Sequence, residues 1–298
     1  MPCFHPLRAF RSASGDVVFV ERGDIVQTLD LPCGQCIGCR LERSRQWAVR
    51  ITHEASLHSQ NCFITLTYDD DHLPSNLSLD HSHFQRFLKR YRKRISPLKI
   101  RYYMAGEYGD DRSRPHYHAC IFGHCPDDLV LHSKSDSGQY VYTSDFLQSL
   151  WPHGYCSVGE LTFESAAYVA RYVLKKITGP LSSRHYEIVD VLTGELTARK
   201  PEYARMSLKP GIAAAWFGKY RSDVYPSDHV LSRGHEAKPP RFYDKLLTRL
   251  DPDLMELVKF SRQERARLQA DDNTRDRLEV KETLAKRRVS DFLSRRLK

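Results

Sequence analysis

The chain has 298 residues, and its 46 Lys and Arg outnumber its 37 Asp and Glu to give a net charge of +9. Such a surface favours a polyanionic partner, with nucleic acid ahead of a membrane, although it can also serve solubility alone. No apolar run approaches the roughly 20 residues needed to span a bilayer, and no signal peptide opens the chain. We therefore expect a cytosolic protein with no membrane partner.

Cysteines gather near the N-terminus, where Cys33, Cys36 and Cys39 follow one another at intervals of three. In a reducing compartment they are thiols or metal ligands rather than disulfides. Their spacing can bring thiolates around one ion, and Cys3, or His5 in its place, would complete a structural Zn²⁺ site. An iron–sulfur cluster would need a fourth cysteine close behind, followed by proline, and the sequence offers neither. We favour zinc over free thiols, and a cluster least.

Two helices and a strand are predicted next. Residues 41–57 form a basic helix that either contacts DNA or is a solvated helix packed through its apolar side chains. Residues 62–68 form a core strand, and residues 80–95 form a helix with one apolar face and a strongly basic opposite face. In the helix over residues 41–57, DNA contact would involve the basic side chains, and packing the apolar ones. The basic side chains are Arg43, Arg45 and Arg50, and the apolar ones are Trp47, Ile51 and Leu57.

A β-hairpin at the centre of the chain is predicted to unite three metal ligands. Residues 99–107 and 114–123 are predicted strands joined by a polar loop. His116 and His118 are two residues apart, so they share one face of their strand. In an antiparallel hairpin Glu107 falls opposite His116 and joins that face. Two imidazoles and one carboxylate leave coordination positions open, which predicts a catalytic metal site. The alternative is structural histidines and a solvated acid.

The segments after the hairpin complete this predicted domain. Residues 124–143 are expected to be a polar excursion, followed by a short helix over residues 146–151 and a strand over residues 155–161. A longer helix over residues 164–177 follows, with Thr162 as its N-cap.

This longer helix carries a second chemical feature. Tyr168 and Tyr172 are four residues apart and lie on one helix face, and Lys175 follows on the same face. A phenol has a reference pKa of about 10, so a nearby cation or base must activate it. Beside a metal site these side chains suggest a tyrosine nucleophile. The alternative is that the tyrosines only pack the helix on the sheet.

These motifs, in this order, resemble a known superfamily. His116-Tyr117-His118 is similar to the His-hydrophobe-His element of HUH endonucleases, residues 168–176 to the paired-tyrosine motif of rolling-circle initiators, and residues 63–68 to their first motif. The combination most resembles the replication initiators of small single-stranded-DNA phages, the microviruses, especially the gokushovirus branch. The N-terminal cysteines, Pro210-Gly211 and residues 216–220 extend the likeness over most of the chain.

The resemblance implies a fold and a reaction. The fold would be α+β, an antiparallel sheet with helices on one face in the ferredoxin/RRM-like palm of HUH endonucleases. The reaction would be nicking of the phage origin through Tyr168 or Tyr172, with Lys175, helped by Lys176, steadying the phenolate or the phosphate. The cofactor would be Mg²⁺ or Mn²⁺.

The same resemblance implies single-stranded and origin DNA and a host helicase as partners, in the host cytoplasm. Two rival functions remain. One is a single-tyrosine HUH transposase or relaxase, and the other is a zinc-stabilised nucleic-acid-binding module without catalysis.

We expect four segments along the chain. They are a cysteine knuckle with the basic helix (1–59), the HUH endonuclease domain (60–180), an elaboration with a hairpin turning at Thr193-Gly194 (181–240) and a charged helical tail (241–298). We assign no chemistry to the elaboration. The tail either binds DNA or a helicase, or is a solvated helix.

Overall fold

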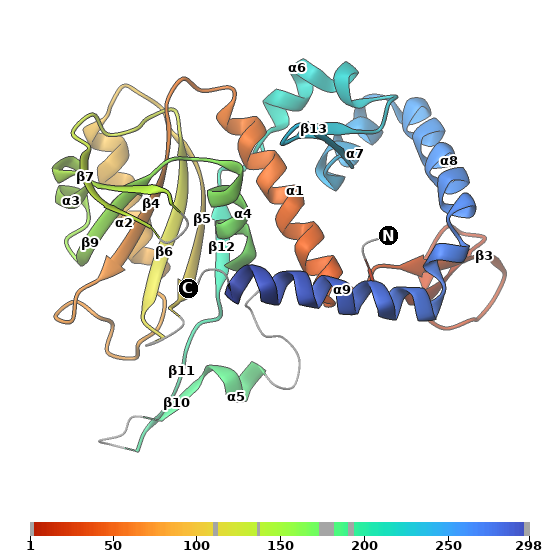
Figure 1. Ribbon diagram of the computed structural model, residues 1–298, viewed down its shortest axis with the longest axis horizontal. Helices are drawn as coiled ribbons and strands as arrows, with labels where there is room; N and C mark the ends of the chain where they lie inside the picture. The colour runs from red at the N-terminus through yellow and green to blue at the C-terminus, as the bar shows by residue number, and fades with distance from the viewer. Residues whose placement is uncertain (1–2, 110–112, 136–137, 173–181, 190–193, 295–298) are drawn as a thin grey trace. The chain divides into compact units, whose positions relative to one another are not determined.

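The structure is a computed structural model (Figure 1), and it describes residues 3–109, 113–135, 138–172, 182–189 and 194–294. The chain divides into two compact units. Unit 1 comprises residues 1–43 and 253–298, and unit 2 comprises residues 44–252. In the part of the chain that the structure describes, no helix combines the length and the apolar character needed to cross a membrane.

A seven-stranded antiparallel sheet forms the centre of unit 2, in the strand order β12-β5-β6-β4-β9-β8-β7 (Figure 1). Its strands are β4 (Asn61–Tyr68), β5 (Arg101–Tyr108), β6 (Pro115–Phe122), β7 (Val130–Lys134), β8 (Tyr140–Thr143), β9 (Gly154–Gly159) and β12 (Tyr203–Met206). With its helices this sheet makes the α+β class that the sequence predicted.

One face of the sheet packs against helices α2 (His81–Arg94) and α3 (Asp145–Leu150). The side chains of β4 alternate, and Ile64 and Leu66 are fully buried in this core. Asp80 caps α2 by accepting the N–H of Ser82 at 2.9 Å, close to the predicted start of the helix. The buried residues of α2, which follow the predicted helical spacing, are Phe84, Phe87, Leu88 and Tyr91. Since this face of β4 is committed to the core, its other residues point to the opposite face.

Helices α1 (Ile37–Ala55) and α4 (Phe163–Tyr172) provide side chains on that opposite face. The indole of Trp47 packs on the ring of Tyr103 in β5, with 4.8 Å between centroids. The hydroxyl of Ser44 donates to the carbonyl of Ala167 at 3.0 Å and ties α1 to α4. These contacts hold α4 close to the sheet.

At least one arginine of helix α1, the predicted basic helix, packs against other side chains of unit 2. The guanidinium of Arg50 lies 4.1 Å from the ring centroid of Trp47 and 3.8 Å from that of Phe242. It also donates to the carbonyl of Ile212 at 3.0 and 3.2 Å, and burial lowers its pKa to about 10. Arg50 is therefore a packing residue, which neither interpretation of this helix predicted.

The sheet is larger than the sequence predicted. The prediction of a polar excursion over residues 124–143 is wrong, because β7 and β8 form a hairpin there that extends the sheet from β9. All five residues of β7 are exposed, so this edge strand lacks the apolar alternation that reveals a strand in sequence. At the other edge, β12 pairs with β5, with Tyr203 opposite Gly106. That partner comes from about 100 residues away, which no local pattern reveals.

The predicted hairpin of the later segment is present. Strands β10 (Glu187–Val189) and β11 (Leu196–Ala198) pair antiparallel, and residues 190–193 of its turn lie outside the described residues. The remaining elements of unit 2 are α5 (Ser182–Tyr186), α6 (Ala214–Val224), β13 (Val230–Ser232), β14 (His235–Ala237) and α7 (Arg241–Leu250).

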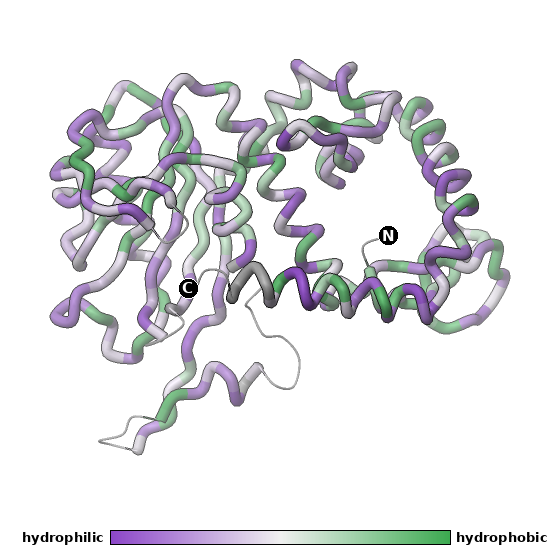
Figure 2. The backbone as a smooth tube through the Cα atoms, in the orientation of Figure 1, coloured by the Kyte–Doolittle hydropathy of each residue, from purple (hydrophilic) through white to green (hydrophobic). Residues whose placement is uncertain are grey.

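Unit 1 contains segments from both ends of the chain. Its small antiparallel sheet has the order β2-β1-β3, formed by β1 (Leu7–Ser12), β2 (Val17–Val18) and β3 (Ile25–Leu31). Its helices are α8 (Pro252–Leu268), the short 3₁₀ helix η1 (Asp271–Asn273) and α9 (Arg275–Ser294). Figure 2 shows hydrophobic and hydrophilic residues interleaved along α8 and α9. Within the segment predicted as a charged helical tail, α7 lies in unit 2, whereas α8 and α9 belong to unit 1.

Candidate active site

Three side chains of the central hairpin converge on one point. The Oε1 atom of Glu107 lies 2.7 Å from Nε2 of His116 and 2.9 Å from Nε2 of His118. Glu107 is 1% exposed and His118 5% exposed, whereas His116 is half-buried. A carboxylate and two imidazoles meeting at one oxygen form a cluster that could hold a metal ion.

The register of the hairpin produces this convergence. Glu107 of β5 stands directly opposite His116 of β6, as predicted, and the alternation of β6 places His118 on the same face. On the other side of β6, Thr67 and Thr65 of β4 stand opposite His116 and His118 respectively. The site therefore lies on the face of the sheet opposite the α2–α3 core.

The partners of the outer ring nitrogens fit a metal site. Nδ1 of His116 lies 3.0 Å from the backbone carbonyl of Arg114. A carbonyl only accepts, so Nδ1 donates to it, and Nε2 is then the nitrogen that could bind a metal ion together with the carboxylate. Nδ1 of His118 lies 2.9 Å from the hydroxyl of Thr65. Metal-bound histidines in proteins are held by such contacts to their second nitrogen.

A tyrosine of α4 lies against this cluster. The ring of Tyr168 meets that of His118 edge-on, with 5.3 Å between centroids and a 78° interplanar angle, and it also contacts Phe63 at 6.4 Å. The start of α4 is fixed as predicted, because the Thr162 hydroxyl accepts the N–H of Ser165 at 3.2 Å. The capped helix thus places the ring of Tyr168 beside the Glu107–His116–His118 cluster.

The other residues predicted on this helix are less fully described. Tyr172 is the last residue of α4. Lys175 and Lys176 lie in residues 173–181, outside the described residues.

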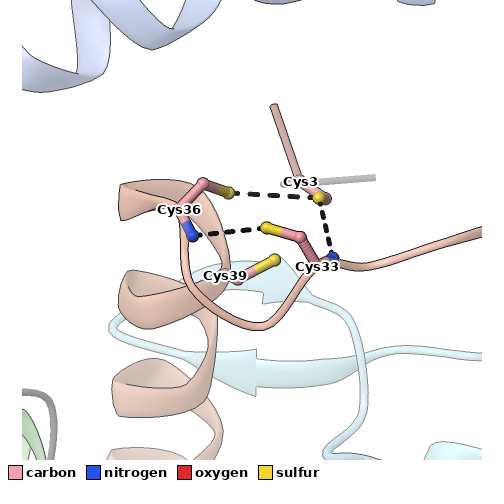
Figure 3. A group of neighbouring side chains, drawn as sticks. All are labelled: Cys3, Cys33, Cys36 and Cys39. Carbon is pink, nitrogen blue, oxygen red and sulfur yellow. Dashed lines mark hydrogen bonds between the residues drawn. The ribbon is translucent and has the colours of Figure 1, made fainter. Parts of the chain in front are cut away.

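The four N-terminal cysteines form a second cluster, in unit 1 (Figure 3). The Sγ atoms of Cys3, Cys33, Cys36 and Cys39 lie within 4.8 Å of one another. Burial tends to raise the pKa of the Cys36 thiol. Hydrogen bonds from the N–H of Phe4 at 3.4 Å, from the N–H of Cys39 and with the thiols of Cys33 and Cys39 outweigh burial and lower this pKa to about 6. Cys3 completes the set, whereas His5 lies 2.9 Å from Glu282 instead.

Comparison with known proteins identifies the family. A family model described as replication-associated protein ORF2/G2P matches residues 61–177. This span contains both the Glu107–His116–His118 cluster and Tyr168. Replication-associated protein VP4 of Bdellovibrio phage phiMH2K is 34% identical over 85% of this chain and 79% of its own length. The chain belongs to the microvirus-type replication initiators.

Two further relatives agree with this assignment. Replication-associated protein ORF2 of Spiroplasma virus 4 is 32% identical to this initiator over 84% of the chain and 81% of its own length. Replication-associated protein ORF4 of Chlamydia phage 1 is 32% identical over 74% of the chain and 54% of its own length. No solved structure matches the initiator.

Sequence reasoning missed two residues on the site face of this initiator. Thr65 contacts His118, and Tyr155 of β9 stands opposite Thr67 in the row that contains Glu107 and His116. Tyr155 is 69% exposed. The alternation of the strand over residues 62–68 could have placed Thr65 on the face away from the core. The neighbour relation between β4 and β9 could not be read from the sequence.

Proposed function

We propose that this replication initiator is an HUH-type endonuclease and strand transferase acting on single-stranded DNA. It would nick the phage origin through a tyrosine nucleophile and start rolling-circle replication, with a host helicase separating the strands. One observation carries the proposal: the ring of Tyr168 lies against His118, within the cluster where Glu107 and His116 also meet.

The donor set of the cluster suits a catalytic metal. Three protein ligands are fewer than Mg²⁺ or Mn²⁺ require, so coordination positions remain for phosphate oxygens. When bound by Glu107, His116 and His118, Mg²⁺ or Mn²⁺ would neutralise charge that builds on the scissile phosphate. Imidazole ligands favour Mn²⁺, whereas Mg²⁺ is the more abundant ion.

The covalent step belongs to the tyrosines. The phenolic oxygen of Tyr168 forms a bond to phosphorus while the bond from phosphorus to the 3′ oxygen breaks. The phenol gives up its proton, and the departing 3′ oxygen gains one. One phosphodiester is exchanged for another, so the 5′-phosphotyrosine link conserves the bond energy needed for rejoining.

The second tyrosine of the motif, Tyr172, would have a role of its own. Tyr172 follows one helical turn after Tyr168, so it would allow a second cleavage while the first strand end is still attached. Lys175 would stabilise the phenolate or the phosphate by its charge, with Lys176 as a helper. Repeated rounds of rolling-circle synthesis need such a second cleavage.

The test is formation of the covalent adduct. The full chain would be incubated with the circular single-stranded phage genome and Mn²⁺, and the protein–DNA adduct measured on a denaturing gel. We expect Tyr168→Phe and Tyr172→Phe each to retain part of the adduct and the double variant to lose it. Tyr155→Phe, which removes a hydroxyl from the same face of the sheet, serves as the matched control and should form normal adduct. An undiminished adduct in the double variant would refute the tyrosine assignment.

The metal ligands need a separate test. We expect His118→Ala to abolish cleavage but to leave affinity for single-stranded DNA, whereas His132→Ala, which changes an exposed histidine of β7, should leave both intact. Binding in both variants should weaken steeply with salt because it depends on phosphate contacts. If His118→Ala and a chelator both left cleavage unchanged, the metal site would be wrong. DNA binding without any nicking by the native protein would favour the non-catalytic binding module.

A further inference from the structure

The cysteine cluster of unit 1 draws on three separate segments. Cys3 precedes β1, Cys33 and Cys36 lie in the loop after β3, and Cys39 lies in the first turn of α1. Leu7 pairs with Leu31, so the start of β1 and the end of β3 are at the same end of the small sheet. Figure 3 shows the four side chains turned toward a common centre from these segments.

The spacing of the sulfurs fits a single ion. Zinc–sulfur bonds of about 2.3 Å in a tetrahedron place neighbouring sulfurs about 3.8 Å apart. The sulfurs of Cys3 and Cys36 are 4.0 Å apart, and all four lie within 4.8 Å of one another. In a [4Fe–4S] cluster each thiolate binds a different iron, and in a [2Fe–2S] cluster the thiolates bind in two pairs on two irons. In both cases some of the sulfurs stand farther apart, so the geometry favours a mononuclear site.

The backbone around the cluster is arranged for thiolates. The N–H of Cys33 points to the sulfur of Cys3 at 3.2 Å, that of Cys36 to the sulfur of Cys33 at 3.3 Å, and that of Phe4 to the sulfur of Cys36 at 3.4 Å. Donors of this kind stabilise negative charge on sulfur, and a metal-bound cysteine is deprotonated. Three such donors on three of the four sulfurs are hard to explain for a set of ordinary core thiols.

We propose that Cys3, Cys33, Cys36 and Cys39 bind one structural Zn²⁺ ion that fastens the N-terminal segment and the small sheet to the start of α1. Four protein ligands close the coordination sphere, so the ion has no position for substrate. This site is separate from the proposed nuclease centre and goes beyond the proposed function.

The small sheet buries too few apolar side chains to be stable without an additional constraint. Most residues of β1, β2 and β3 are exposed or half-buried, and among the strand residues only Ala9 and Phe10 are buried. An apolar core this small stabilises little, and segments of this size commonly depend on a metal. The free energy of zinc binding would thus become folding free energy of this segment.

Metal analysis of the full-length protein tests the proposal. The native chain would be purified without chelator, and its metal content measured by inductively coupled plasma mass spectrometry. We expect one zinc per molecule. Cys36→Ser should lose nearly all of it, and Cys125→Ser, which removes a thiol outside the cluster, should keep it. The double variant Glu107→Gln/His118→Ala should also keep its zinc, because that change affects only the other candidate centre.

Two further measurements guard against misfolding of the cysteine variant. Exchange of the native metal for Co²⁺ should give the thiolate charge-transfer and tetrahedral d–d absorption of a four-sulfur site. Removal of zinc should make residues 3–43 of the native chain sensitive to limited proteolysis. A metal-free or iron-containing native protein, full zinc in Cys36→Ser, or absence of the Co²⁺ thiolate bands would overturn the proposal.

Discussion

The hydroxyl of Thr65 lies 2.9 Å from Nδ1 of His118, on the side of the imidazole away from Glu107. This contact couples a central strand of the sheet to the candidate metal centre. Thr65 stands directly opposite His118 in the β4–β6 pairing, so the sheet register itself brings the two side chains together. We therefore expect Thr65 to act as a positioning residue that holds the orientation of the ring.

Thr65→Val tests this relationship with little change of volume. Loss of such a partner typically lowers metal affinity or activity about 10- to 100-fold, so we expect cleavage to fall by that range at limiting Mn²⁺. Saturating Mn²⁺ should restore part of the loss, and single-strand affinity should not change. Thr67→Val, two residues along the same face, is the matched control. Equal loss in both variants, without rescue by metal, would mean that Thr65 acts only through packing.

Tyr155 gives a second prediction, which rests on the proposed function. The backbone of Tyr155 lies two strands from that of His116, about 10 Å at the usual strand spacing. The side chain is largely exposed on the same face of the sheet. Stacking of a base on an aromatic side chain is worth about 1–3 kcal/mol.

Tyr155→Ala should therefore weaken binding of single-stranded DNA roughly 5- to 150-fold in a fluorescence titration. Adduct formation at saturating DNA should persist. Tyr155→Phe keeps the ring and should bind normally. Normal affinity in the alanine variant would place the DNA elsewhere on the protein.

His53 gives a prediction about pH and stability. Its ring stacks on Trp216 at 3.6 Å between centroids, and its Nδ1 lies 2.7 Å from the Tyr243 hydroxyl. Burial lowers the pKa of His53 to about 4, below the ordinary 6.5. The unfolded chain therefore binds more protons between these values. The stability contributed by neutral His53 is complete above pH 6.5 and is lost as the pH falls from 6.5 through 4.

This loss amounts to up to about 3 kcal/mol. Thermal unfolding of the native protein should shift downward between pH 7 and pH 4.5. His53→Asn should be less stable at pH 7 but should show a flatter pH dependence, with His132→Asn behaving like the native chain. Burial also lowers the pKa of His153 to about 4, helped by the neighbouring charges of His83 and His72, so the flattening should be partial. An identical pH dependence in His53→Asn and the native chain would contradict this role.

The local features of this initiator were predictable from its amino-acid pattern. The period of two in β6 and the antiparallel hairpin fixed Glu107, His116 and His118 on one face, because both depend on residues that are neighbours in the chain. The cap at Thr162 was likewise readable from local pattern. The three-residue spacing of the cysteines marked a possible metal site for the same reason.

Features that depend on pairing between distant segments became visible only in the folded chain. The placement of β4 between β6 and β9 brings Thr65 beside His118 and aligns Tyr155 with Thr67 and His116. The edge strand β12, which pairs with β5, comes from a segment far along the chain. The edge strand β7 escaped prediction because all of its residues are exposed, so its sequence lacks the alternation that a buried face produces. The packing of Tyr168 on His118 also follows from the docking of α4, since helical spacing defines a face but not what that face meets.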